Sequence, residues 1–196
     1  MAYDSDFYTQ YAKYLLEPRV RQCHDMAIKM ARDLFRSDLD YVIDLGCGEH
    51  REFLKYGSPR CYCGVDTVAE SCDVQKDYRT LDYTQERFQP YTSFVSLFST
   101  EITAPAFKNY DLYTRIFREM SRCRVGVVSG FYYYSKQHEN PVVETGDIVS
   151  YQTLDLMGSC PYPIESFEEI QVTMHVPSQM FGLDVYEVWK FFRRKE

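Results

Sequence analysis

Residues 44–48 are the part of the chain whose types and spacing most plainly predict chemistry. An apolar run ends at Asp44, and Gly46 and Gly48 then stand on either side of Cys47. Glycine tolerates positive φ and lets a ligand approach the backbone, so the pattern is typical of a buried strand followed by a tight turn with open backbone amides. Small molecules bind at the carboxyl ends of strands in open α/β sheets. The segment therefore predicts a small-molecule site that Asp44 faces.

Two further carboxylates follow apolar segments in the same manner. Asp66 comes directly after residues 61–65, and Asp82 follows Leu81. The carboxyl ends of parallel strands meet at one edge of a sheet, so we expect both carboxylates to lie near Asp44. Each also has a simpler interpretation, because a carboxylate at such a position often caps a helix or ends a strand. It is their order after successive strands that favours a shared site.

Alternating helices and strands are expected to position these residues. Apolar residues at helical spacing predict helices over residues 7–15, 18–34 and 107–122, with a short one near 49–56. Strands are predicted over residues 41–43, 61–65 and 93–98, in a segment that ends at 80–82, and from residue 125 onward. Such alternation indicates a mostly parallel sheet with right-handed crossovers.

The C-terminal part departs from this alternation. Residues 170–176 alternate between apolar and polar side chains, and residues 183–192 form a second strand after Pro177 and Gly182. Their connection is too short for a parallel crossover, so these strands must be antiparallel. Residues 142–149 also predict a hairpin with a glycine turn.

Composition excludes several classes of function. The chain has 196 residues, which is typical of one domain, and its net charge of −7 argues against a large nucleic-acid interface. Seven cysteines without a CxxC pair indicate reduced thiols in a cytoplasmic protein, and no metal site is expected. No apolar run reaches the ~20 residues that span a bilayer, and no signal peptide is predicted.

Other glycine motifs fit less well. A dinucleotide-binding turn would carry glycine or alanine where Arg51 stands. The chain contains neither a P-loop nor the Gly-x-Ser-x-Gly turn of α/β hydrolases.

On these motifs, the chain resembles the class I S-adenosylmethionine-dependent methyltransferases from about residue 8 to its end. Their first strand ends in an acidic residue and Gly-x-Gly-x-Gly, which residues 44–48 match in part, with His50 at the third glycine position. The resemblance implies a single domain over residues 1–196, a three-layer α/β sandwich. Its mostly parallel seven-stranded sheet would be closed by the antiparallel C-terminal hairpin. Residues 1–37 would form N-terminal helices that act as a lid, and residues 131–167 a substrate-side insertion.

The resemblance also implies that S-adenosylmethionine is the cofactor. The glycine turn would hold its methionine part with Asp44 near the amino group, Asp66 would bind the ribose hydroxyls, and Asp82 the adenine amino group. The full set of implied cofactor-binding residues is Tyr11, Asp44, Gly46, Cys47, Gly48, Asp66, Thr67, Asp82, Tyr83, Ser99 and Thr100.

The implied activity is methyl transfer to a small molecule, with a nitrogen or oxygen acceptor left open. His138 and Tyr134 are the candidate catalytic residues, as bases for an acceptor that must lose a proton. The Asn/Asp-Pro-Pro-Tyr motif of nucleic-acid amino methyltransferases does not follow the fourth predicted strand, and a protein side chain is the second choice of acceptor. The alternative is a non-catalytic protein of this fold that binds the cofactor or a partner protein, which His50 makes a real option. Oligomeric state stays open.

Overall fold

The computed structural model describes residues 13, 16–97, 106–134, 143–145, 148–150, 167–180 and 183–194. Four residues of the expected site, Tyr11, Ser99, Thr100 and His138, lie outside the described ranges, as does most of the first predicted helix.

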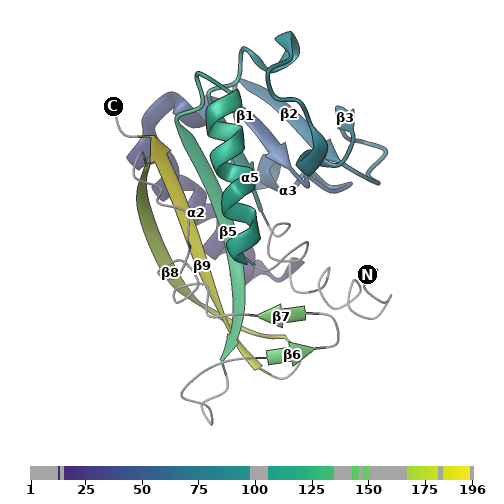
Figure 1. Ribbon diagram of the computed structural model, residues 1–196. Coiled ribbons are helices and arrows are strands. Elements are labelled where there is room, and N and C mark those ends of the chain that lie inside the picture. The colour runs from purple at the N-terminus through teal and green to yellow at the C-terminus, as the bar shows by residue number, and fades with distance from the viewer. Residues whose placement is uncertain are drawn as a thin grey trace.

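A central sheet with the strand order β3-β2-β1-β4-β5-β9-β8 organises the chain (Figure 1). The strands are β1 (Tyr41–Leu45), β2 (Cys61–Asp66), β3 (Val74–Gln75), β4 (Ser93–Ser96), β5 (Val125–Tyr134), β8 (Phe167–Met180) and β9 (Leu183–Arg194). Neighbours among the first five pair in parallel, whereas β9 is antiparallel to both β5 and β8. The predicted parallel sheet with an antiparallel C-terminal pair is therefore confirmed. The predicted small hairpin is also present, as β6 (Val143–Thr145) and β7 (Ile148–Ser150).

Helices cover both faces of this sheet. Helices α2 (Pro18–Phe35) and α3 (Glu52–Tyr56) pack on one face, and α5 (Ala106–Glu119) on the other (Figure 1). Successive strand residues alternate between the faces. Val42 thus belongs to the core cluster under α2 and α3, while Ile43 belongs to the cluster under α5. Three short 3-10 segments complete the described elements: Arg36–Asp40, Tyr78–Thr80 and Glu86–Phe88.

Helix α2 follows directly from its sequence. Pro18 stands at the first helical position, where its missing N–H costs nothing. Val20, Ala27 and Ala31 recur at helical spacing and are fully buried against the sheet.

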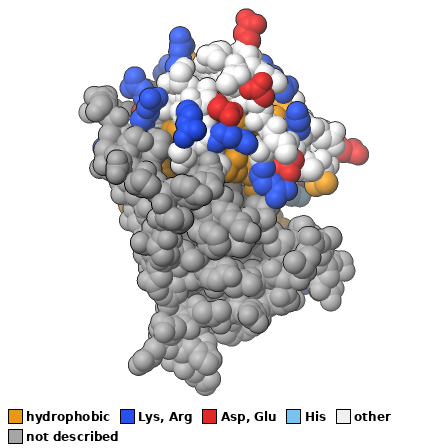
Figure 2. Space-filling view, in the orientation of Figure 1, with side chains coloured by type: hydrophobic (Ala, Val, Ile, Leu, Met, Phe, Trp, Pro, Cys, Tyr) orange, Lys and Arg blue, Asp and Glu red, His pale blue; other side chains and the backbone are white. Residues whose placement is uncertain are grey.

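None of the described helices is long and apolar enough to cross a membrane. Figure 2 shows Lys and Arg side chains among Asp and Glu side chains on the described part of the surface. Within α5, Arg115 and Glu119 form an ion pair.

The third strand was predicted wrongly. It is β3, only two residues long, and it pairs with the end of β2 through Val65 and Val74. The segment predicted as a strand that ends at 80–82 instead contains the 3-10 turn Tyr78–Thr80, which Asp77 caps by accepting a hydrogen bond from the Arg79 N–H at 2.9 Å. This local carboxylate-to-backbone bond competes with strand pairing.

Strand β5 is longer than expected. Residues 131–134, predicted to begin the substrate-side insertion, continue β5 and pair with residues 184–187 of β9. Aromatic residues favour strands, and Phe131 and the tyrosines after it form such a run. Strand β8 likewise continues past Pro177, with a register shift between Val176 and Gln179. Proline cannot donate to the sheet, so the irregularity falls at this position.

Candidate functional site

The turn after β1 has the backbone conformation that its glycines predict. Gly46 and Gly48 have φ angles of 73° and 62°, in the region that side chains with a Cβ rarely adopt. The amides of Gly46 and Cys47 donate to the Val65 carbonyl at 2.8 and 3.1 Å, which ties the turn to the end of β2. A Cβ built on Gly48 would meet no atom of the described residues within 4 Å. Among these residues, the space beside Gly48 is thus open.

Cys47 contributes backbone rather than a reactive thiol. Its side chain is buried, and its sulfur would lie 2.8 Å from a Cβ built on Gly64. Burial raises the pKa of the Cys47 thiol to about 12, so the thiol stays protonated at neutral pH. Among the described residues, no group of three or more His, Cys, Asp or Glu side chains could hold a metal ion.

After the two glycines, the residue with a left-handed backbone is Arg51 and not His50. Arg51 has a φ of 45°, whereas His50 is exposed and lies in the turn. Arg51 precedes the first residue of α3, Glu52, so the helix begins three residues later than predicted. His50, the residue at the third glycine position, therefore lies in the turn before the helix and not at its start.

Asp44 is a buried carboxylate with one oxygen left over. Its exposed fraction is 1%, and the Tyr62 hydroxyl donates to Oδ2 at 2.7 Å. Oδ1 is buried as well and has no hydrogen-bond partner among the described residues. Burial raises the pKa of Asp44 to about 7, and the Tyr62 hydrogen bond opposes that rise. Buried polar atoms are nearly always hydrogen-bonded, so an unpartnered carboxylate oxygen needs an explanation such as a ligand.

Asp66 connects the glycine turn to the loop after β2. Its Oδ1 accepts hydrogen bonds from the amides of Val68 and Ala69 at 2.9 and 3.1 Å, and its Oδ2 accepts one from the Gly48 amide at 3.0 Å. An ionised carboxylate has about four acceptor positions, so Oδ2 keeps capacity for a further donor. Thr67, next in the chain, is exposed.

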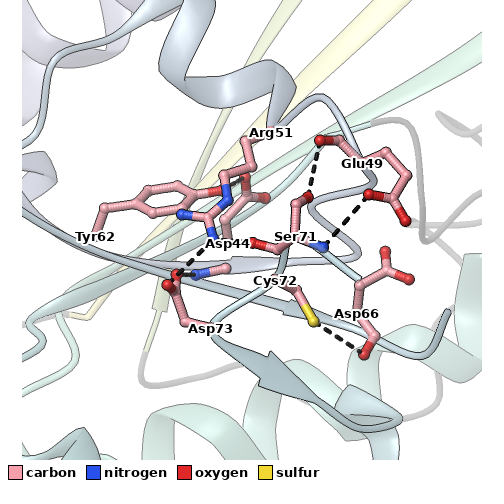
Figure 3. A network of polar contacts seen from close by, with 9 residues as sticks. Asp44, Glu49, Arg51, Tyr62, Asp66, Ser71, Cys72 and Asp73 are labelled. Carbon is pink, nitrogen blue, oxygen red and sulfur yellow. Dashed lines mark hydrogen bonds and ion pairs between the residues drawn. The ribbon is translucent and has the colours of Figure 1, made fainter. Parts of the chain in front are cut away.

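Four side chains, which we call the loop clasp, join the same two loops from outside: Glu49, Arg51, Ser71 and Asp73 (Figure 3). The Glu49 carboxylate accepts a hydrogen bond from the Glu70 amide at 2.7 Å, and the backbone carbonyl of Glu49 accepts one from the Ser71 hydroxyl at 2.9 Å. Arg51 donates to the Ser71 carbonyl and to Asp73. Sequence reasoning missed the loop clasp, because its partners are 20 to 22 residues apart in the chain. The only local signal was the charged run directly after the glycines.

Asp82 and Tyr83 lie in a loop that α5 supports. Asp82 is exposed, and its Oδ1 accepts hydrogen bonds from the Thr84 amide and hydroxyl, which lower the pKa of Asp82. Tyr83 is fully buried and its hydroxyl donates to the Tyr78 carbonyl at 2.6 Å, so its side chain packs in the core. Among the hydrogen bonds of the described residues, none joins Asp82 to the glycine turn.

The structure thus brings together part of the expected set. Asp44, Gly46, Gly48 and Asp66 form one connected arrangement at the carboxyl ends of β1 and β2. Tyr134, a candidate base, is the last residue of β5 and pairs with Asp184.

Sequence comparison finds no relative: no family model matches the chain, and no curated protein matches it. Structure comparison does find similar folds. One is magnesium protoporphyrin IX methyltransferase from Synechocystis PCC 6803 with bound S-adenosylmethionine, at a TM-score of 0.56 and 12% identity over 97% of this chain and 92% of that one. Another is the methyltransferase domain of a bacterial Hen1, at 0.56 and 16% over 91% and 100%.

A third is 1,6-didemethyltoxoflavin-N1-methyltransferase from Burkholderia thailandensis with bound 1,6-didemethyltoxoflavin and S-adenosylhomocysteine. Its TM-score is 0.55 at 13% identity, over 100% of this chain and 92% of that one. Likeness at such identities shows a shared fold.

Proposed function

We propose that this chain, whose fold is that of the class I S-adenosylmethionine-dependent methyltransferases, binds S-adenosylmethionine beside its glycine turn and methylates a small molecule. The observation that carries the proposal is the Asp44 carboxylate, buried at the end of β1 with Oδ1 unpartnered among the described residues. A buried carboxylate oxygen without a hydrogen-bond partner destabilises the folded protein unless a ligand supplies a donor. The ammonium group of the cofactor's methionine part is a donor of the required charge.

The glycine turn fits the same group. Open space beside Gly48 would admit a ligand against the backbone, because a side chain is missing there. The two positive-φ glycines hold the turn in a shape that the amides of Gly46 and Cys47 fasten to β2. The turn is therefore shaped before any ligand arrives, which reduces the entropy lost on binding.

Asp66 is proposed to bind the ribose hydroxyls. Three backbone amides hold its carboxylate in one orientation, and one acceptor position of Oδ2 remains for a hydroxyl. Thr67 and Asp82, which are exposed, are proposed to complete the cofactor site together with Tyr11, Ser99 and Thr100, which lie outside the described residues. For Tyr83 the proposal is limited to the backbone, because the ring is buried in the core.

Methyl transfer makes modest demands on this chain's side chains. S-adenosylmethionine, when bound, supplies a methyl group on a positively charged sulfur. The residues around the glycine turn need to hold donor and acceptor in line, and such alignment accounts for much of the rate in reactions of this kind. His138 and Tyr134 are proposed as bases for an acceptor that must lose a proton.

A small-molecule acceptor is supported by two observations. The chain's net charge of −7 disfavours a polyanionic substrate. Two similar structures are methyltransferases named for small molecules, magnesium protoporphyrin IX and 1,6-didemethyltoxoflavin.

Calorimetric titration of the full chain with S-adenosylmethionine and S-adenosylhomocysteine tests the cofactor. Saturable one-to-one binding of both is expected. Incubation with methyl-labelled S-adenosylmethionine and pools of small molecules, followed by mass spectrometry, then tests the transfer and identifies the acceptor. No binding of either compound would contradict the proposal.

The second candidate is a non-catalytic protein of the same fold. The hydrogen bonds of Asp66 favour this candidate. Its carboxylate already accepts hydrogen bonds from three backbone amides and so has a structural role without a ligand. This candidate predicts binding of neither compound, or binding of both with no labelled product from any pool.

A further inference from the structure

We propose that Tyr62 is a positioning residue of the cofactor site, one that holds Oδ2 of Asp44 so that Oδ1 alone receives the ligand's ammonium group. The inference rests on the proposed cofactor site and adds to it a residue from β2 that no motif marks. It begins with the 2.7 Å hydrogen bond from the Tyr62 hydroxyl to Asp44 Oδ2. That bond occupies one carboxylate oxygen and leaves the other without a partner among the described residues.

The register of β1 and β2 makes this contact possible. Tyr62 stands opposite Val42, and Gly64 stands opposite Asp44. The phenol therefore reaches Asp44 diagonally, along the space that a side chain at position 64 would occupy. A Cβ built on Gly64 would lie 3.2 Å from the Tyr62 hydroxyl oxygen and 2.8 Å from the Cys47 sulfur. Glycine at position 64 is thus what lets the hydroxyl meet the carboxylate.

The Tyr62 ring is itself held by two neighbours. It stacks on Phe53 of α3 with ring centroids 6.4 Å apart and planes 8° from parallel. The Arg51 guanidinium lies 5.6 Å from the ring centroid and also contacts Asp73 in the loop clasp (Figure 3). A ring held in this way has few alternative rotamers, so its hydroxyl is fixed against Asp44. The arrangement is preorganised for a single donor at Oδ1.

The charges around Asp44 decide when Oδ1 can attract a cation. Burial raises the pKa of Asp44 to about 7, and the Tyr62 hydrogen bond is the strongest opposing influence. Of the other groups nearby, Asp66 on β2 and Glu52 on α3 raise this pKa, and Arg51 lowers it. Cys47 is uncharged at neutral pH, and burial raises the pKa of the Tyr62 hydroxyl, so that hydroxyl remains a donor.

The sign of the expected effect follows. The hydrogen bond stabilises the charged carboxylate, so its loss raises the pKa of Asp44 further. At a given neutral pH more of the variant protein then carries a neutral Asp44, which attracts an ammonium group weakly. Affinity for a ligand with an ammonium group should fall, and the pH at which binding is half lost should rise. A ligand without that group should be insensitive to the change.

Tyr62→Phe removes the hydroxyl and keeps the ring. Tyr41→Phe is the matched control, because Tyr41 begins β1 and its side chain is exposed. Calorimetry between pH 6 and 8 would use two ligands, S-adenosylhomocysteine and 5′-methylthioadenosine, which lacks the amino-acid part. For Tyr62→Phe we expect S-adenosylhomocysteine to bind about tenfold more weakly at neutral pH, with the midpoint raised by about one pH unit. Binding of 5′-methylthioadenosine should be unchanged, and Tyr41→Phe should match the wild type with both ligands.

Each of the following results would overturn the inference. If Tyr62→Phe binds S-adenosylhomocysteine as the wild type does, Tyr62 does not position Asp44, and the proposed cofactor site stands. If both ligands weaken equally with no change in the pH profile, Tyr62 only supports the fold. If the wild type binds neither ligand, the proposed function fails and this inference with it. Should Tyr62→Phe not fold, the wild type alone decides, since its preference for S-adenosylhomocysteine over 5′-methylthioadenosine must fall as pH drops through about 7. A constant preference would overturn the inference.

Discussion

Replacing Asp66 with asparagine separates the two roles of this carboxylate. Its Oδ1 accepts the Val68 and Ala69 amides and its Oδ2 accepts the Gly48 amide. Asparagine keeps one oxygen, which would remain with Val68 and Ala69 because that turn is local. Its amide nitrogen would then face the Gly48 N–H, donor against donor. The variant thus loses the bond between the two loops and also the charged acceptor proposed for the ribose hydroxyls.

The size of the effect can be worked from these contacts. A hydrogen bond to a charged group contributes roughly 1.5–3 kcal/mol, so loss of the ribose contact should weaken binding of S-adenosylhomocysteine by about 10- to 100-fold. Loss of the bond between Gly48 and Asp66 should lower the free energy of unfolding by about 1–2 kcal/mol. Calorimetry measures the first quantity and urea denaturation the second.

Asp77→Asn is the matched control for Asp66→Asn. Asp77 also accepts a backbone N–H, from Arg79, but it caps the 3-10 turn and is not part of the proposed site. It should lose stability and keep wild-type affinity. Affinity of Asp66→Asn within twofold of the wild type would refute the reasoning, as would an equal loss of affinity in Asp77→Asn.

Three further substitutions test the structure at single positions. Gly48→Ala should lower the free energy of unfolding by about 1–2 kcal/mol in urea denaturation, because a Cβ strains the φ of 62° although no atom of the described residues lies within 4 Å of it. Unchanged stability would contradict the positive φ at this position. Asp44→Asn should stabilise the unliganded protein at pH 8 by up to about 4 kcal/mol. The pKa of Asp44 is about 7 in the folded state and 3.8 ordinarily, so ionisation of the buried carboxyl group lowers the stability of the wild type as pH rises between these values, and asparagine cannot ionise. That gain should shrink toward zero near pH 4 in thermal denaturation, and a gain independent of pH would count against burial as its cause. Gly126→Ala should cost about 1–3 kcal/mol in urea denaturation, because its Cβ would lie 2.4 Å from the Phe94 ring; a neutral substitution would mean that the ring can move aside.

The elements with strong periodicity were predictable. The apolar stripe of α2 and the alternation of residue types along residues 170–176 each repeat within one element, so the sequence records them directly. The connection between β8 and β9 permits only an antiparallel pair, which made the end of the sheet predictable as well.

Short or capped segments were not predictable in the same way. Strand β3 has only two residues, Val74 and Gln75, which is too few for a period, and Asp77 redirected the chain that follows into a 3-10 turn. The continuation of β5 through Tyr134 depends on pairing with β9, about 50 residues away, and no local pattern shows where such pairing stops.

The candidate site was predictable at its glycines and at two of its three carboxylates. The conformation of Gly46 and Gly48 follows from residue type, and Asp44 and Asp66 lie at the ends of neighbouring parallel strands as expected. Asp82 does not end a strand, because the third strand is Val74–Gln75. Tyr62 and the loop clasp were not predictable, because their contacts join residues 18 to 22 positions apart through side-chain geometry. The position of the left-handed residue, Arg51 rather than the residue at the third glycine position, also required the structure.

The most direct test of the central claim is amide-resolved NMR of the full chain titrated with S-adenosylhomocysteine. The proposed site predicts saturable shifts that begin at the amides of Gly46, Gly48 and Val68, with little change at Cys123 at the opposite end of the sheet. Saturation with no shift at the glycine turn, or no binding at all, would contradict the account.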